Sequence, residues 1–71
     1  MSNAKIKAAR EANPGIGING LTVEIAERLN VDIPTAAIVQ REVEVIVWDL
    51  SGATQREINA AIDEAGSQVA A

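Results

Sequence analysis

The residues that could support chemistry in this 71-residue chain are acidic side chains, one small basic group and a glycine-rich segment. Histidine, cysteine and tyrosine are absent. A structural zinc site, a Ser/His/Asp or Cys/His catalytic group and a histidine base are therefore excluded, because each needs one of these side chains. The missing cysteines also exclude a disulfide framework, so nothing indicates an oxidising compartment.

Neighbouring carboxylates occur at three places in the sequence. They are Glu24 and Glu27, Glu42 and Glu44, and Asp63 and Glu64. General acid–base catalysis needs two carboxyl groups that converge on one cleft with separated pKa values. Nothing in these spacings predicts such convergence, and no Asp-rich calcium loop is present. We therefore expect no enzymatic activity, no bound metal and no cofactor.

Three glycines have the spacing of a dinucleotide-binding loop: Gly15, Gly17 and Gly20. That chemistry requires a preceding strand, a following helix and a complete βαβ unit. The segment before Gly15 is typical of a helix, and the chain is too short for the fold. We interpret residues 13–20 as a Gly-rich loop between helices.

The basic cluster consists of Lys5, Lys7 and Arg10. It is either an arm that touches nucleic acid or an acidic protein surface, or the solvated face of a short helix. The net charge of −4 and the isoelectric point near 4.5 argue against a nucleic-acid-binding surface. The longest run of large apolar residues, 45–48, is far shorter than the roughly 18 residues of a membrane span. We expect neither nucleic acid, membrane nor small molecule as a partner.

Local signals divide the chain into three or four short helices, so we predict one small all-α domain over residues 1–71. Alanines favour a helix over residues 3–12, and Pro14 with its neighbours ends it. A second helix is predicted over residues 21–29, where leucine and isoleucine recur at a spacing of four. Asn30 suits the turn that follows, because asparagine tolerates a left-handed conformation.

The last helix begins at a capping-box pattern, formed by Thr54 and Glu57. Its apolar positions recur at intervals of three and four, at Ile58, Ala61, Ile62 and Ala65. Gly66 is a natural C-terminal cap. Residues 67–71 are interpreted as a C-terminal tail of small residues.

Residues 34–50 predict a long central helix with two apolar faces. One face carries a heptad-like stripe at Ala36, Val39, Val43, Ile46 and Leu50, and we assign Val39, Val43, Ile46 and Leu50 to the internal core. The other face carries Ala37, Ile38, Val45 and Trp48, interrupted by Arg41. A helix on the surface of a monomer needs only one apolar face. This helix is therefore either central in its own fold or shared with a partner.

A strand over residues 42–48 is the alternative, which would make the fold α+β. The segment begins with polar and apolar residues in alternation and is rich in β-branched side chains, which favour strands. Ile46 and Trp48 break the alternation, and only the brief segment 16–18 offers a neighbouring strand.

Residues 22–41 resemble a helix-turn-helix unit. Residues 22–29 look like its first helix, Asn30 and Val31 occupy its turn, and Ala36 and Val39 take apolar positions of its second helix. The resemblance implies a second helix that lies in the DNA major groove. The positions that would meet DNA are Asp32, Ile33, Pro34, Thr35, Ala37 and Ile38. Base readout uses Arg, Lys, Asn or Gln, so these positions lack the basic and polar side chains of the family.

The chain is too short and too poor in aromatic residues to build a strong core alone. Below roughly 70–80 residues a core seldom contributes more than about 3–5 kcal/mol, and Trp48 is the sole aromatic. We therefore expect a non-catalytic interaction subunit that forms a homo-oligomer or docks on a larger protein assembly. Phage capsid accessories and adaptor proteins are of this type.

The predicted partner interface is Ile38, Val45 and Trp48 with Ala37 and Arg41. We expect the chain in the cytoplasm or in a virus particle assembled there. The alternative function is a small dimeric helix-turn-helix regulator.

Overall fold

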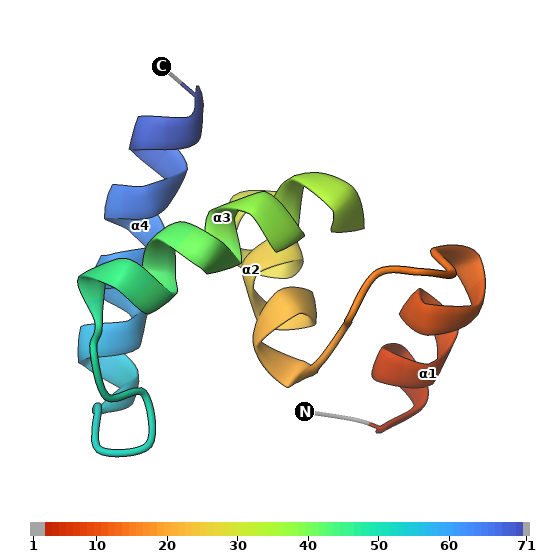
Figure 1. The fold of residues 1–71 in the computed structure, drawn as a ribbon, viewed down its shortest axis with the longest axis horizontal. Coiled ribbons are helices and arrows are strands. Elements are labelled where there is room, and N and C mark those ends of the chain that lie inside the picture. Colours follow the sequence, from red (N-terminus) through yellow and green to blue (C-terminus); the bar gives the residue numbers. More distant parts are fainter. Residues whose placement is uncertain (1–2, 71) are drawn as a thin grey trace.

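The chain folds into four α-helices, as the computed structural model of residues 3–70 shows (Figure 1). They are α1 (Asn3–Ala12), α2 (Gly20–Leu29), α3 (Ile33–Ile46) and α4 (Gln55–Ala70). No strand occurs between residues 3 and 70. The all-α prediction is confirmed, and the alternative strand over residues 42–48 is wrong. Residues 42–46 belong to α3, where side chains at intervals of three and four can reach the core.

The core is formed where one side of α3 packs against both α2 and α4 (Figure 1). Its buried side chains are Ile25 of α2, Ala36, Val39 and Val43 of α3, and Ala61, Ile62 and Ala65 of α4. Leu21, Leu29, Val31, Leu50 and Ile58 pack around this cluster. The predicted apolar face of α4 is thereby confirmed.

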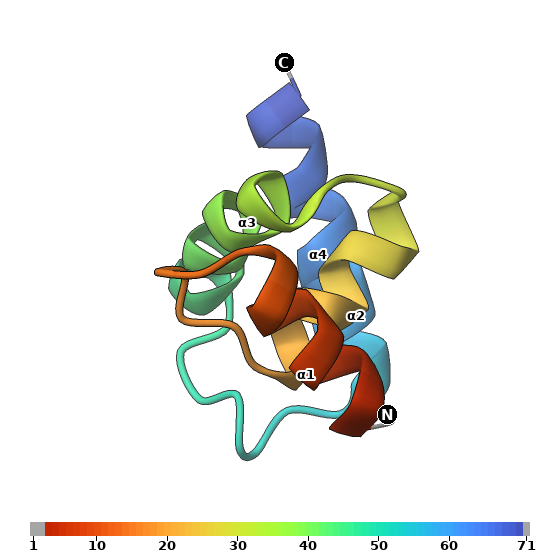
Figure 2. The same ribbon diagram turned by 90° about the vertical axis from the view of Figure 1, so that its right-hand side faces the viewer.

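α1 lies against α2 and contributes no buried side chain (Figure 2). Polar contacts attach it to the rest of the domain. Lys5 Nζ lies 2.7 Å from Glu27 Oε2, and Arg10 Nε donates a hydrogen bond of 2.9 Å to the carbonyl oxygen of Ile18. Ile18 itself is buried, so the connection between α1 and α2 is anchored at that point.

The helix ends follow the local chemistry of the sequence. Asn30 has φ of 56° and closes α2 in the left-handed conformation, as predicted. The side chain of Asp32 accepts a hydrogen bond of 2.9 Å from the backbone N–H of Thr35 and caps α3. At the start of α4, the Thr54 backbone donates to Glu57 Oε1 and the Glu57 backbone donates to Thr54 Oγ1, which confirms the capping box.

α3 is shorter than the predicted helix over residues 34–50. It ends at Ile46, and Val47 has an extended backbone. The sequence after this point forms a turn, in which the Gly52 N–H donates to the Asp49 carbonyl and Ser51 Oγ donates to Asp49 Oδ1 at 2.6 Å. Aspartate at the start of such a turn and glycine at its end are the residues that β-turns favour. Turn chemistry therefore overrides the apolar periodicity.

α4 is longer than predicted, because it continues through Gly66 to Ala70. The predicted tail over residues 67–71 is helical up to residue 70, and residue 71 lies outside the described part. Gly66 serves packing and does not end the helix. A Cβ atom built on it would lie 2.9 Å from Leu29 Cδ1, so glycine lets α4 approach α2 closely. The loop predicted over residues 13–20 is one residue shorter, since α2 begins at Gly20.

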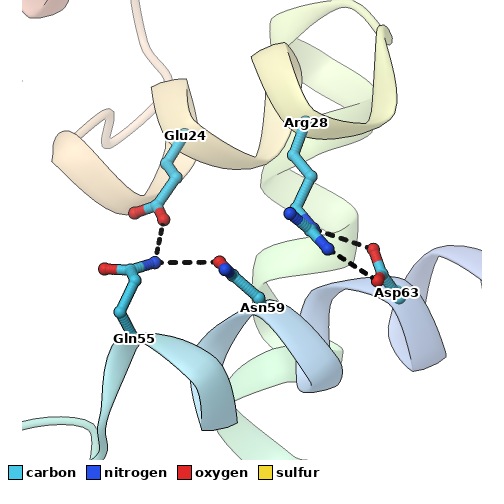
Figure 3. Close-up of polar contacts among 5 residues, drawn as sticks. All are labelled: Glu24, Arg28, Gln55, Asn59 and Asp63. Atoms are coloured by element: carbon cyan, nitrogen blue, oxygen red, sulfur yellow. Dashed lines mark hydrogen bonds and ion pairs between the residues drawn. The ribbon is translucent and has the colours of Figure 1, made fainter.

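Polar side chains also join α2 to α4 on the solvent side of the core (Figure 3). Arg28 forms a bidentate pair with Asp63, with Nε to Oδ1 at 2.9 Å and Nη2 to Oδ2 at 2.8 Å. Gln55 Nε2 donates to both Glu24 and Asn59. The hydrogen bonds from Arg28 lower the pKa of Asp63 from its usual value.

The Arg28–Asp63 pair predicts acid-sensitive stability. Because the pKa of Asp63 is lower in the folded chain than in the unfolded one, the ionised carboxylate stabilises the fold at neutral pH. This contribution is lost as the pH falls through the folded pKa. Asp63→Asn should therefore lower the melting temperature near pH 7, and its difference from the wild type should shrink on acidification.

Thermal unfolding followed by circular dichroism across the acid range measures this effect. Glu64→Gln is the matched control, since Glu64 is exposed and forms no ion pair within residues 3–70. A melting-temperature difference between Asp63→Asn and the wild type that stays the same at every pH would contradict the assignment.

Candidate functional site

The side of α3 that faces away from the core carries large apolar side chains in water. Ile38 is 54% exposed and Val45 is 73% exposed. Arg41 lies between them at intervals of three and four residues, which places all three on one helix face. We call Ala37, Ile38, Arg41, Val45 and Trp48 the outer stripe; these are the residues that the sequence predicts as an interface. Its opposite side holds the fully buried Val39 and Val43.

Trp48 lies two residues beyond the end of α3, so helical spacing does not place it on the face that carries Ile38 and Val45, as the longer predicted helix would have done. It is 95% exposed, although tryptophan is the largest apolar side chain in the sequence. The extended residue Val47 and the turn at Asp49 present it to solvent. The hydrogen bond from Ser51 lowers the pKa of Asp49, so a charged carboxylate stands directly beside the indole in sequence. Monomeric proteins rarely leave a cluster of large apolar side chains in water without a function.

Two predicted core residues behave differently once α3 ends early. Leu50 reaches the core from the turn and packs against it, as predicted. Ile46 does not: it is 37% exposed, so its assignment to the internal core is wrong. The physical reason is its place as the last residue of α3: the extended Val47 and then Leu50 pack against the core after it. Ile46 lines a shallow hollow together with Trp48.

A groove runs between the outer stripe and the connection from α1 to α2. It encloses about 380 Å³ and is lined by Ile16 on the loop side and by Ala37, Ile38, Arg41 and Glu44 on α3. A polar network holds the loop in place: the Asn19 side chain accepts from the Thr22 backbone, and Thr22 Oγ1 donates to Gln40 of α3. Thr22 is fully buried, so this network links the loop to α3 beside the groove.

The basic cluster does not form a free arm. Lys5 is paired with Glu27, and Arg10 donates to the Ile18 carbonyl. Lys7 is exposed and has no ion pair in the part of the chain that the structure describes. Two of the three predicted residues therefore attach α1 to the domain.

Several of the paired carboxylates contact polar side chains of the chain. Glu24 accepts from Gln55, Glu27 pairs with Lys5, and Asp63 pairs with Arg28. Among residues 3–70 no group of three carboxylates, histidines or cysteines is placed to hold a metal ion. The glycine motif follows helix α1 and not a strand, and Gly15 adopts φ of 89° in the turn after it.

A second groove, of about 500 Å³, was missed by the sequence reasoning. It lies where Leu29 and Val31 meet Val39 of α3 and Val69 of α4. Because residues 67–71 were predicted as a tail, Val69 was not placed on a helix beside Leu29. The available signal was the spacing of Ile62, Ala65 and Val69, which continues the helical interval of three and four past Gly66.

Comparison with known proteins adds no functional relative. No protein-family model matches the chain, and neither a curated protein nor a solved structure does. Within residues 3–70 no helix has the length and apolarity to cross a membrane.

Replacing valine by aspartate should have very different effects on stability at positions 43 and 45, which lie on opposite sides of α3. Val43→Asp places a lone carboxylate in the core, which costs several kcal/mol and should unfold a domain of this size. Val45→Asp places it in water and should change the free energy of unfolding by less than about 1 kcal/mol, including its effect at the helix C-terminus.

Urea unfolding of dilute samples, followed by far-UV circular dichroism, compares the two variants. Equal destabilisation by both substitutions would contradict the assignment of Val45 to a solvent-facing surface.

Proposed function

We propose that this chain is a non-catalytic interaction subunit that binds protein through the outer stripe. One observation carries the proposal. Five large apolar side chains are strongly exposed between residues 3 and 70, and four of them lie on α3 or directly after it: Ile38, Val45, Ile46 and Trp48. Single exposed apolar residues are normal on a protein surface, whereas a concentration of them within one short segment, residues 38–48, is typical of a binding surface.

The composition of the outer stripe supports the same function. Tryptophan and arginine are the residues that most often dominate the binding energy of protein interfaces, and both are present here. Aliphatic side chains flank them at Ile38 and Val45, and the groove beside Arg41 offers a concave complement. A small acidic subunit of this kind suits a multi-subunit particle, such as a phage capsid accessory or an adaptor protein, in the cytoplasm or in a virus particle assembled there.

Photo-crosslinking in the cells that make the protein tests this function. A photoreactive phenylalanine analogue in place of Trp48 should form a covalent adduct with protein. The same analogue in place of Glu64, an exposed position on α4 outside the outer stripe, should not. Absence of an adduct from position 48, or equal adducts from both positions, would contradict the proposal.

A dimeric DNA-binding regulator is the second candidate. One observation favours it: only residues 30–32 separate α2 from α3, as in the helix-turn-helix units that this region resembles. The exposed face of α3 opposes it, because the single cation Arg41 stands among apolar side chains and two carboxylates, Glu42 and Glu44.

We predict no binding to random duplex DNA at about 50 mM salt, where a phosphate-binding protein shows its highest affinity. Fluorescence anisotropy of labelled DNA measures this. Binding whose affinity falls steeply with salt would replace the interaction-subunit proposal by the regulator.

A further inference from the structure

The outer stripe and its edge carry one charge of each sign without a polar partner among residues 3–70. Arg41 stands between Ile38 and Val45, and Glu44 lies three residues further along α3. Neither side chain forms an ion pair or a hydrogen bond with any residue from 3 to 70. Both line the same groove. The surface therefore offers a cation within an apolar line and an anion at its edge.

We propose that the outer stripe binds a second copy of this chain, with the two α3 helices antiparallel and Arg41 of each copy paired with Glu44 of the other. The inference rests on the proposed function and names its partner. A two-fold axis at the level of residue 43 brings each Arg41 beside Glu44 and Val45 of the other copy. The same axis brings each Ile38 opposite the segment that contains Trp48.

Charge favours this occupant over a partner that carries a single sign of charge. A wholly basic partner would leave Arg41 facing like charge, and a wholly acidic partner would do the same for Glu44. A two-fold copy supplies both signs in the inverse order along the helix. The net charge of −4 opposes self-association only weakly, because charges separated by more than about 8 Å are screened at physiological salt.

We expect the dimer to be small and weak. A standard interface takes about 800 Å² from each partner, and the accessible surface of this chain is 4607 Å². The outer stripe occupies one face of the 14-residue helix α3 together with Trp48, so we expect an interface at or below that size. Association should then depend on concentration, and buried area alone does not fix its affinity.

Sedimentation equilibrium of the purified chain over low micromolar to millimolar concentration tests the dimer. The mass should rise from 7.4 kDa towards twice that value, and Trp48 emission should shift to the blue. Arg41→Glu and Glu44→Arg should each weaken association by about ten-fold or more, because each places like charges in contact. The double variant Arg41→Glu/Glu44→Arg should restore it at unchanged net charge.

Mixing the two single variants provides a control that needs no further mutation. One variant presents two anions and the other two cations, so the mixture should associate more strongly than either variant alone. Far-UV circular dichroism confirms that each variant is helical. A monomer at every concentration, single variants that associate like the wild type, or a mixture that stays monomeric would overturn the inference.

The two proposals fail in different ways. A protein crosslinked to position 48 in cells, with a purified chain that stays monomeric, would keep the interaction function and remove the second copy as its partner. Absence of both results would remove both proposals.

Discussion

The packing seam along one side of α3 is the constraint on which this small domain depends. Val39 and Val43 are fully buried there, between Ile25 of α2 and Ile62 of α4. Because α2 and α4 both pack against the same side of α3, only that side of the helix is buried. The β-branched side chains on the other side of α3 consequently have no place in the core. α1 could have covered them, but its contacts, such as Lys5 with Glu27, attach it to α2.

This arrangement links the fold to its proposed use. The core is small and mostly aliphatic, and the one aromatic residue, Trp48, stands outside it at 95% exposure. Moving Trp48 into the core would have added more buried apolar area than any other residue in the sequence. Its position therefore costs the isolated chain stability and leaves apolar area available for a partner. The polar network of Asn19, Thr22 and Gln40 keeps the neighbouring loop fixed beside that surface.

Local chemistry made most of the fold predictable from the sequence. The capping box of α4 and the left-handed Asn30 follow from side chains within three residues of a helix end, so both are confirmed, while α2 and α3 each begin one residue earlier than predicted. The C-terminal ends of α3 and α4 depend on more than the apolar pattern of each helix. α3 ends at Ile46 although its apolar pattern continues to Leu50, because a turn forms at Asp49. Gly66 lies inside α4 and does not end it, and Leu29 packs closely against it. The two faces of α3 were visible as a periodicity. The contacts of Lys5 and Arg10 could not be predicted from the sequence, because a contact between separate elements has no fixed spacing along the chain.

Quenching of Trp48 fluorescence tests the central claim most directly, because the chain contains a single tryptophan. The protein is diluted until its molar mass in solution is that of a monomer. Acrylamide is then added to the native and to the urea-unfolded protein. Our account predicts nearly equal quenching in the two states, since the indole of the folded monomer already lies in water. Strong protection of Trp48 in the dilute folded monomer would contradict it, because the indole would then belong to the chain's own core.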